Sequence, residues 1–351
     1  MNRLLIHITL LLSLLSCEDV YRPEIIEVAS LPVIECRITN NPAFNYIIVS
    51  KTTKFTGMQT PDPINDAKIE VLKEDGTFYQ ATHTYLGYYS FNQALETGKR
   101  YKLRIILDKE LFESSWETMP ALPTIEKFYV EPHVQVKYAN NLYGIPSKYY
   151  TKGFQASVDL PVNERNKYYL FRWHSYLQFV IQKQNFRSYE WLSFTKSGSD
   201  NMAEPSLHSS SNLISKHQLM FNTLDYLSYL DTADHRDRIE AMDLGWIFEI
   251  DQYSQSDGAH QFFKSAADQL KAEGQLFDPM YSQIRGNISC TTDPEKHMLG
   301  VFDLCSLTRH QYYVSDIEAG NIYYHKIEPI FDIPYEGTSE RIPPVFWQRK
   351  R

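Results

Sequence analysis

The sequence lacks an excess of basic residues, a glycine-rich phosphate loop and any apolar run long enough to cross a membrane. Its 35 Lys and Arg residues are outnumbered by 43 Asp and Glu residues, so the formal net charge is −8. This acidity argues against nucleic acid, or an anionic membrane surface, as the partner. The apolar run at residues 4–15 is shorter than the roughly 20 residues that a transmembrane helix needs.

Catalytic signatures are missing as well. The sequence contains no Gly-x-Ser-x-Gly nucleophile turn and no paired histidines of the zinc-protease type. Its cysteines have no histidine at metal-ligand spacing. We therefore expect no metal, no cofactor and no enzymatic activity. The alternative is a surface hydrolase of glycans or peptides, for which carboxylate pairs such as Glu249 and Asp251 on one predicted strand are candidates.

The amino terminus has the layout of a secretory signal peptide. Arg3 is the only charge before the apolar run, which leads into Leu14-Leu15-Ser16-Cys17. A small residue directly before a cysteine resembles the bacterial lipobox, in which cleavage exposes a cysteine that is acylated. We therefore expect residues 1–16 to be removed and Cys17 to carry acyl chains such as palmitate, which anchor a protein stably when two or more are present. The alternative is an ordinary secreted protein in which Cys17 is a normal thiol.

Two acidic residues, Glu18 and Asp19, follow this cysteine. Acidic residues at this place resemble the surface-export signal of Bacteroidetes lipoproteins. We therefore expect a lipid anchor in the outer membrane and display on the cell surface, with the periplasmic face as the alternative.

Three cysteines remain once Cys17 is acylated. Cys290 and Cys305 flank a turn-containing segment, 291–295, and would face each other across a hairpin in an oxidising compartment. A disulfide between them would stabilise the fold by about 3 kcal/mol. The sequence does not decide between this disulfide and two free thiols. Cys36 lies in a strand-like segment, which predicts a buried free thiol.

The first part of the chain predicts a β-sandwich. The 25 Tyr and 19 Phe residues of the sequence favour strands. Short alternating segments with turn signals between them, including the hairpin signal Asp75-Gly76, run from residue 31 to residue 123. We therefore expect an extended tether at 17–30 and a β-sandwich domain at 31–123.

Residues 124–351 predict a larger β-rich domain with at least one inserted helix and an extended tail. Strands are expected at 154–160, 168–176, 179–183, 189–194, 246–250, 286–290, 298–304 and 311–317. The helix is expected at 256–273, where Phe262, Phe263, Ala266 and Leu270 recur at helical spacing before Gly274.

Several short motifs follow one another in a specific order. They are Cys17-Glu18-Asp19, Leu31-Pro32-Val33-Ile34-Glu35, Asp66-Ala67-Lys68-Ile69-Glu70-Val71, Asp75-Gly76, Gly87-Tyr88-Tyr89, Gly98-Lys99-Arg100-Tyr101-Lys102-Leu103, Tyr168-Tyr169-Leu170-Phe171-Arg172-Trp173, Gln275-Leu276-Phe277-Asp278-Pro279, Ile284-Arg285-Gly286-Asn287-Ile288, Leu299-Gly300-Val301-Phe302 and Pro344-Val345-Phe346-Trp347. In this order the chain resembles the Bacteroidetes lipoproteins of domain-of-unknown-function family 4249. One departure is Tyr335-Glu336-Gly337, where many members carry a cysteine pair.

The resemblance implies an Ig-like or transthyretin-like (carboxypeptidase-regulatory-like) sandwich in the first half. It also implies a gene beside a TonB-dependent outer-membrane transporter, and it offers no catalytic residues to carry over. The expectation is therefore a non-enzymatic accessory lipoprotein of a nutrient-uptake system, which binds the transporter, a glycan or peptide ligand, or both. The alternative outside uptake is an adhesion or structural module on the cell surface.

Overall fold

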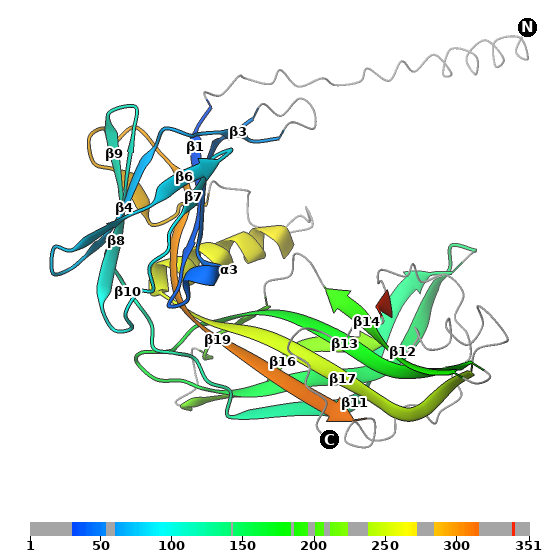
Figure 1. Ribbon diagram of the computed structural model, residues 1–351. Coiled ribbons are helices and arrows are strands. Elements are labelled where there is room, and N and C mark those ends of the chain that lie inside the picture. The colour runs from blue at the N-terminus through cyan, green and yellow to red at the C-terminus, as the bar shows by residue number, and fades with distance from the viewer. Residues whose placement is uncertain are drawn as a thin grey trace, which may run out of the picture.

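Strand pairing between distant parts of the chain determines the fold. The computed structural model describes residues 30–53, 60–141, 143–183, 186–195, 201–206, 211–223, 238–271, 284–315 and 339–340. Cys17, the predicted tether before residue 30 and nearly all of the predicted tail lie outside these residues. Within them the chain is mainly β, with two β-rich bodies set at an angle and one helix between them (Figure 1).

The elements have the following bounds. The strands are β1 (Pro32–Ile38), β2 (Tyr46–Lys51), β3 (Asp62–Pro63), β4 (Lys68–Lys73), β5 (Phe78–Gln80), β6 (Thr82–Tyr85), β7 (Tyr88–Ser90), β8 (Arg100–Leu107), β9 (Glu110–Ser114), β10 (Glu117–Thr118), β11 (Lys127–Asn140), β12 (Pro146–Pro161), β13 (Tyr169–Lys183), β14 (Phe186–Thr195), β15 (Asn201–Ala203), β16 (Leu213–Thr223), β17 (Arg238–Gln255), β18 (Ile288–Cys290), β19 (Leu299–Ser315) and β20 (Ser339–Glu340). The helices are the short 3-10 turn η1 (Pro42–Phe44) and α3 (Asp257–Lys271).

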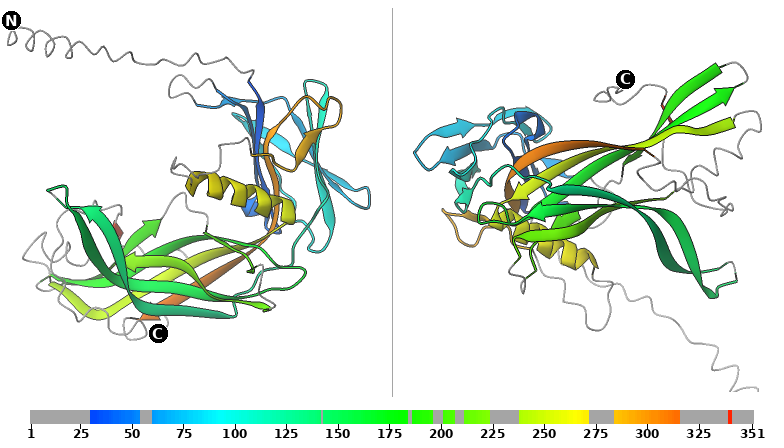
Figure 2. Two further views of the ribbon diagram at one scale, coloured as in Figure 1. Left: turned by 180° about the vertical axis from the view of Figure 1, so that it is seen from behind. Right: turned by 90° about the horizontal axis from the view of Figure 1, so that it is seen from below.

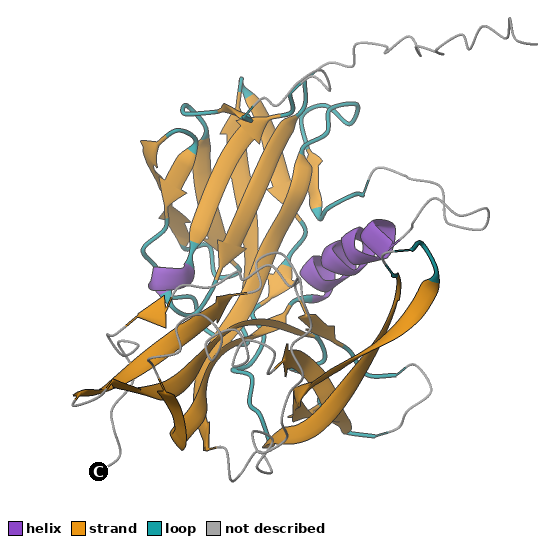
Figure 3. Ribbon diagram, turned by 90° about the vertical axis from the view of Figure 1, so that its right-hand side faces the viewer, coloured by secondary structure: helices purple, strands orange, loops and turns teal. Residues whose placement is uncertain are grey.

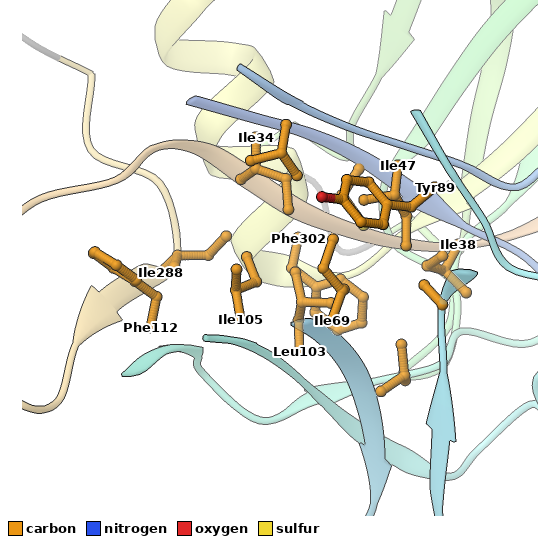
Figure 4. Packing of buried hydrophobic residues seen from close by; sticks show 14 of the residues in the cluster. Ile34, Ile38, Ile47, Ile69, Tyr89, Leu103, Ile105, Phe112, Ile288 and Phe302 are labelled. Atoms are coloured by element: carbon orange, nitrogen blue, oxygen red, sulfur yellow. The ribbon is translucent and has the colours of Figure 1, made fainter. Parts of the chain in front are cut away.

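Two facing sheets form the N-terminal sandwich. One has the order β19-β1-β2-β7-β6 and the other the order β18-β9-β8-β4-β5. Because side chains alternate across a strand, Ile34 and Ile47 of the first sheet meet Ile69 and Leu103 of the second, and each is at most 1% exposed (Figure 4). The predicted β-sandwich is therefore confirmed as a two-sheet arrangement, while its finer transthyretin-like topology stays a prediction.

Late residues of the chain complete this sandwich. β19 pairs in parallel with β1, with Arg37 opposite Asp303, and β18 pairs with β9. Ile288 and Phe302 lie in the same apolar core as Ile34. The predicted boundaries placed everything after residue 123 in the second domain, whereas the structure adds 288–304 to the first. The paired residues are 266 positions apart for β1 and β19 and 174–178 positions apart for β9 and β18, so no local pattern could indicate them.

The C-terminal body is a second pair of packed sheets. β11, β12 and β16 form a three-stranded sheet that packs on β13, β17 and the second half of β19. Phe154, Phe171, Trp246 and Phe248 fill the space between them and are fully buried. β19 passes without a break from the sandwich into this body, which Figure 2 shows from two directions. Its 17 residues replace the two strands predicted at 298–304 and 311–317.

Helix α3 covers the angle between the two bodies (Figure 3). Its start follows β17 directly, and its described part ends at Lys271. The helix predicted at 256–273 is confirmed over Asp257–Lys271. Ala259 and His260 are buried against the sheets, whereas Leu270 is 86% exposed, so the first turns provide most of the contact.

Candidate functional site

Of the two alternatives left open for Cys290 and Cys305, the structure has the free thiols. Cys36, Cys290 and Cys305 are all buried free thiols, which confirms the prediction for Cys36 and contradicts the disulfide. Cys290 belongs to the core of the N-terminal sandwich, while Cys305 lies in a separate cluster with Leu170 and Tyr253. The reason is strand pairing: Cys290 lies opposite Phe112 on β9 and Cys305 opposite Gln255 on β17, so the two residues do not share a hairpin.

A cleft opens where the N-terminal sandwich, the C-terminal body and the start of α3 meet. Its volume is about 730 Å³, inside the range of about 300–1,000 Å³ that is usual for ligand sites. Residues from four separate segments line it, namely 115–121, 97–99, 164–168 and 255–258. In Figure 1 β10, which forms part of the first of these segments, lies beside the start of α3.

A buried carboxylate closes one side of this junction cleft. Glu117 is 7% exposed, and its Oε1 accepts hydrogen bonds from Ser115 Oγ at 2.6 Å and Asn287 Nδ2 at 3.1 Å. The carboxylate lies against the first turn of α3, so close to Gly258 that a Cβ at that position would collide with it. A negative charge at a helix N-terminus is favourable by about 0.3–1 kcal/mol. Glu117 is thus engaged by the protein itself.

The opposite side is fixed by a contact between the helix and the C-terminal body. The His260 ring stacks on Tyr168 with centroids 3.9 Å apart, and His260 Nε2 lies 2.9 Å from Glu204 Oε2. Lys264, one turn along α3, binds the same carboxylate at 2.5 Å. Burial acts to raise the pKa of Glu204, but the hydrogen bonds from Lys264 and His260 outweigh it and lower that pKa. These contacts hold Tyr168 in place at the cleft.

A buried ion pair lies under α3, on the side facing the sandwich. Arg37 Nε donates to Asp303 Oδ2 at 2.6 Å, and the two side chains are 1% and 2% exposed. The guanidinium carbon lies 4.6 Å from the Tyr253 ring centroid and 5.9 Å from that of Phe263 on α3. Both terminal nitrogens of Arg37 are buried without a hydrogen-bond partner among the described residues. Sequence reasoning missed this pair, since its two members are 266 residues apart.

The carboxylates that would serve a hydrolase are occupied. Arg309 binds Glu249 Oε1 at 3.0 Å and Asp251 Oδ1 at 2.6 Å. Both acids do share a strand face, as the sequence predicted, but Arg309, which lies opposite Asp251 on β19, forms ion pairs with both of them. The geometry is that of a structural ion-pair network, and it does not offer a free acid and base across a cleft.

One surface exposes an unusual number of apolar side chains. The far end of the β11–β12 hairpin projects from the C-terminal body in both views of Figure 2. Its exposed apolar residues are Val134, Val136, Tyr138, Tyr143, Ile145 and Tyr150. Strand β11 was not predicted, although Val134, Val136 and Tyr138 alternate with polar residues along it.

The described ranges contain neither a candidate metal site nor a membrane-spanning helix. No group of three His, Cys, Asp or Glu side chains there could hold a metal ion. No helix among these residues is long and apolar enough to cross a bilayer.

Comparison with known families identifies the chain. The family model described as "Domain of unknown function (DUF4249)" matches residues 18–311. The match spans most of the sequence, so the chain belongs to this family, as the order of motifs predicted. Searches of curated proteins and of solved structures returned no significant match.

Proposed function

We propose that this DUF4249 member is an outer-membrane lipoprotein, anchored through acyl chains on Cys17 and displayed on the cell surface. It acts as a non-enzymatic accessory subunit of a TonB-dependent nutrient-uptake system, where it binds the transporter, its ligand, or both. The observation that carries the proposal is the amino-terminal pattern, a short signal sequence ending at Cys17 and followed by Glu18 and Asp19.

The rest of the molecule supports this role. Only 14 residues, 18–31, separate Cys17 from the start of β1 at Pro32, so a short segment would join the lipidated cysteine to the folded body. The cleft between the two bodies has the size of a ligand site. Glu249 and Asp251, the pair considered for a hydrolase, are engaged by Arg309 and so do not favour hydrolysis.

Co-purification tests the proposal. The full-length protein, carrying an affinity tag at its carboxyl end, is isolated from membranes solubilised in mild detergent. We expect an outer-membrane TonB-dependent transporter to be recovered with it in a fixed ratio. A Cys17→Ala variant, which cannot be acylated, is the matched control and should be lost from the membrane fraction. Recovery of the wild-type protein alone would contradict the proposal.

A second function, adhesion or structural attachment at the surface, is favoured by the exposed hairpin end. Tyr138 and Tyr143 are 72% and 87% exposed there, and large exposed apolar patches mark interaction surfaces. Replacing both by Ser would reduce surface attachment of the bacterium under this alternative. Under the uptake proposal the replacement would leave attachment unchanged.

A further inference from the structure

The junction cleft contains aromatic surface on two of its sides. Trp116 and Tyr168 both line it and are half-buried. Both rings also have partners within the protein. Tyr168 stacks on His260, and the cationic groups of Arg100 and Lys102 lie 5.8 Å and 5.3 Å from the Trp116 ring centroid. Rings held in place in this way lose little conformational entropy when a ligand packs on their exposed part.

The polar groups of the cleft include several without partners. The Ser256 hydroxyl and the Gln255 side-chain amide are buried, and neither has a hydrogen-bond partner among the described residues. Both residues line the cleft, together with the hydroxyl-bearing residues Thr97 and Thr118. Buried polar groups are nearly always hydrogen-bonded in folded proteins, so unpartnered ones beside a cleft indicate a place for polar contacts.

The exposed charges of the cleft are three cations and two carboxylates. Lys99, Arg165 and Lys167 line it, are exposed, and have no ion-pair partner in the described part of the chain. The exposed acids are Glu164 and Asp257, while Glu117 is buried and accepts hydrogen bonds from Ser115 and Asn287. In a chain with a formal net charge of −8, the cleft therefore lacks the overall excess of acid, and its exposed cations outnumber its exposed carboxylates.

The backbone at the cleft does not suit an extended peptide. Peptides that bind by strand addition need a free sheet edge several residues long. Among the described residues, the strands that reach the cleft are β10, which has only two residues, and β17, which contributes only its last residue, Gln255. A compact ligand with hydroxyl groups, an apolar ring face and a negative charge fits better, because each of these features has a counterpart in the lining.

We propose that the junction cleft binds a short acidic oligosaccharide, through ring packing on Trp116 and Tyr168 and charge contacts with Arg165 and Lys167. The acidic group is a carboxylate or a sulfate ester, since both would be recognised by the same cations. This inference rests on the proposed function, because it names the class of nutrient that the accessory lipoprotein would bind.

The test uses the purified full-length protein in detergent, without any transporter. Isothermal titration calorimetry compares three hexasaccharides: a galacturonate, a sulfated galactan and a neutral galactan. We expect one or both acidic sugars to bind and the neutral one to bind at least about tenfold more weakly, as expected when charge-assisted hydrogen bonds are lost. The preferred acidic sugar distinguishes the carboxylate from the sulfate.

Two cleft variants locate the site. The double variant R165Q/K167Q and the variant Trp116→Ala should each bind the acidic sugar with an affinity at least about tenfold lower than that of the wild type. Lys137→Gln and Tyr143→Ala, which change exposed residues on the distant hairpin, should bind as the wild type does. Because Arg165 and Lys167 are exposed, their replacement does not threaten folding.

Three results would overturn the inference. They are no binding of either acidic sugar, equal binding of the neutral one, and unchanged affinity in the charge variant. None of these results bears on co-purification with a transporter, so failure here is distinguishable from failure of the proposed function.

Discussion

At the scale of single residues, the buried Arg37–Asp303 pair should have a large effect on the free energy of unfolding when one member is replaced. Removing one member of a buried pair leaves an uncompensated charge, which costs about 3–5 kcal/mol, whereas replacing both by apolar residues is often neutral. We therefore expect Arg37→Met and Asp303→Leu each to lower the free energy of unfolding by about 3–5 kcal/mol. The double variant should recover most of this loss, as measured by urea unfolding.

An exposed pair provides the matched control for this cycle. Lys216 and Glu131 also form an ion pair, but their side chains are both 52% exposed. Glu131→Gln should therefore change the free energy of unfolding by less than about 1 kcal/mol. Equal effects at the exposed and the buried pair would contradict the assignment of Arg37 and Asp303 to the interior.

The thiols are a second prediction at this scale. Burial raises the pKa of Cys36 and of Cys305 well above the ordinary thiol value. The reactive thiolate forms only near or above the pKa, so both thiols should resist Ellman's reagent at pH 8 in the native protein and react after unfolding. Peptide mapping without reduction should show Cys290 and Cys305 as separate free thiols. A cross-linked 290–305 peptide would contradict the structure.

At the scale of elements, β19 approaches β1 through a glycine. Gly300 has φ of +106°, and a Cβ there would collide with the Ile34 carbonyl oxygen. Gly300→Ala should therefore lower the free energy of unfolding by about 1–3 kcal/mol from backbone strain, with the collision adding to it. Gly76→Ala is the control for strain alone, since Gly76 has φ of +90° but open space around it. Equal losses in the two variants would show that the close approach to Ile34 costs nothing.

Elements that depend on neighbouring residues could be predicted from the sequence. The Asp75-Gly76 turn joins β4 and β5, and Thr77 N donates to Asp75 Oδ1 at 2.9 Å. Helix α3 was predicted because its apolar spacing is visible within one stretch. The long β19 was not predicted as one strand, since the two strands expected at 298–304 and 311–317 left the polar residues Arg309 and His310 between them. In the structure these side chains bind Asp251 and Gln252 of the neighbouring strand.

The candidate site shows the same limit. Glu249 and Asp251 were assigned to one strand face correctly, but their partner Arg309 comes from a strand about 60 residues later. The cleft combines segments near residues 98, 117, 165 and 256, so no local motif marks it. Pairing over such separations depends on the whole fold, which a single sequence does not display.

At the scale of the whole molecule, one strand belongs to both bodies. Phe302 of β19 is fully buried in the N-terminal sandwich, while Val314 of the same strand packs in the C-terminal body. Phe302→Ala should lower the free energy of unfolding by about 3–5 kcal/mol. Because β19 is shared, hydrogen exchange should quicken in β12 as well as in β2. The control is Leu270→Ala, at a side chain that is 86% exposed. This variant should change neither the free energy of unfolding nor hydrogen exchange in β2 and β12. Faster exchange in β2 alone would show that the bodies unfold independently.

The placement of the whole molecule rests on its lipid anchor. The most direct test is mass spectrometry of the amino-terminal peptide of the mature protein, purified from bacterial membranes. It measures where the mature chain begins and whether Cys17 is acylated. We expect the mature chain to begin at Cys17, with the mass of a diacylglycerol on the thiol and further mass when the amine is acylated. A mature chain that begins at another residue, or a Cys17 with a free thiol, would contradict it.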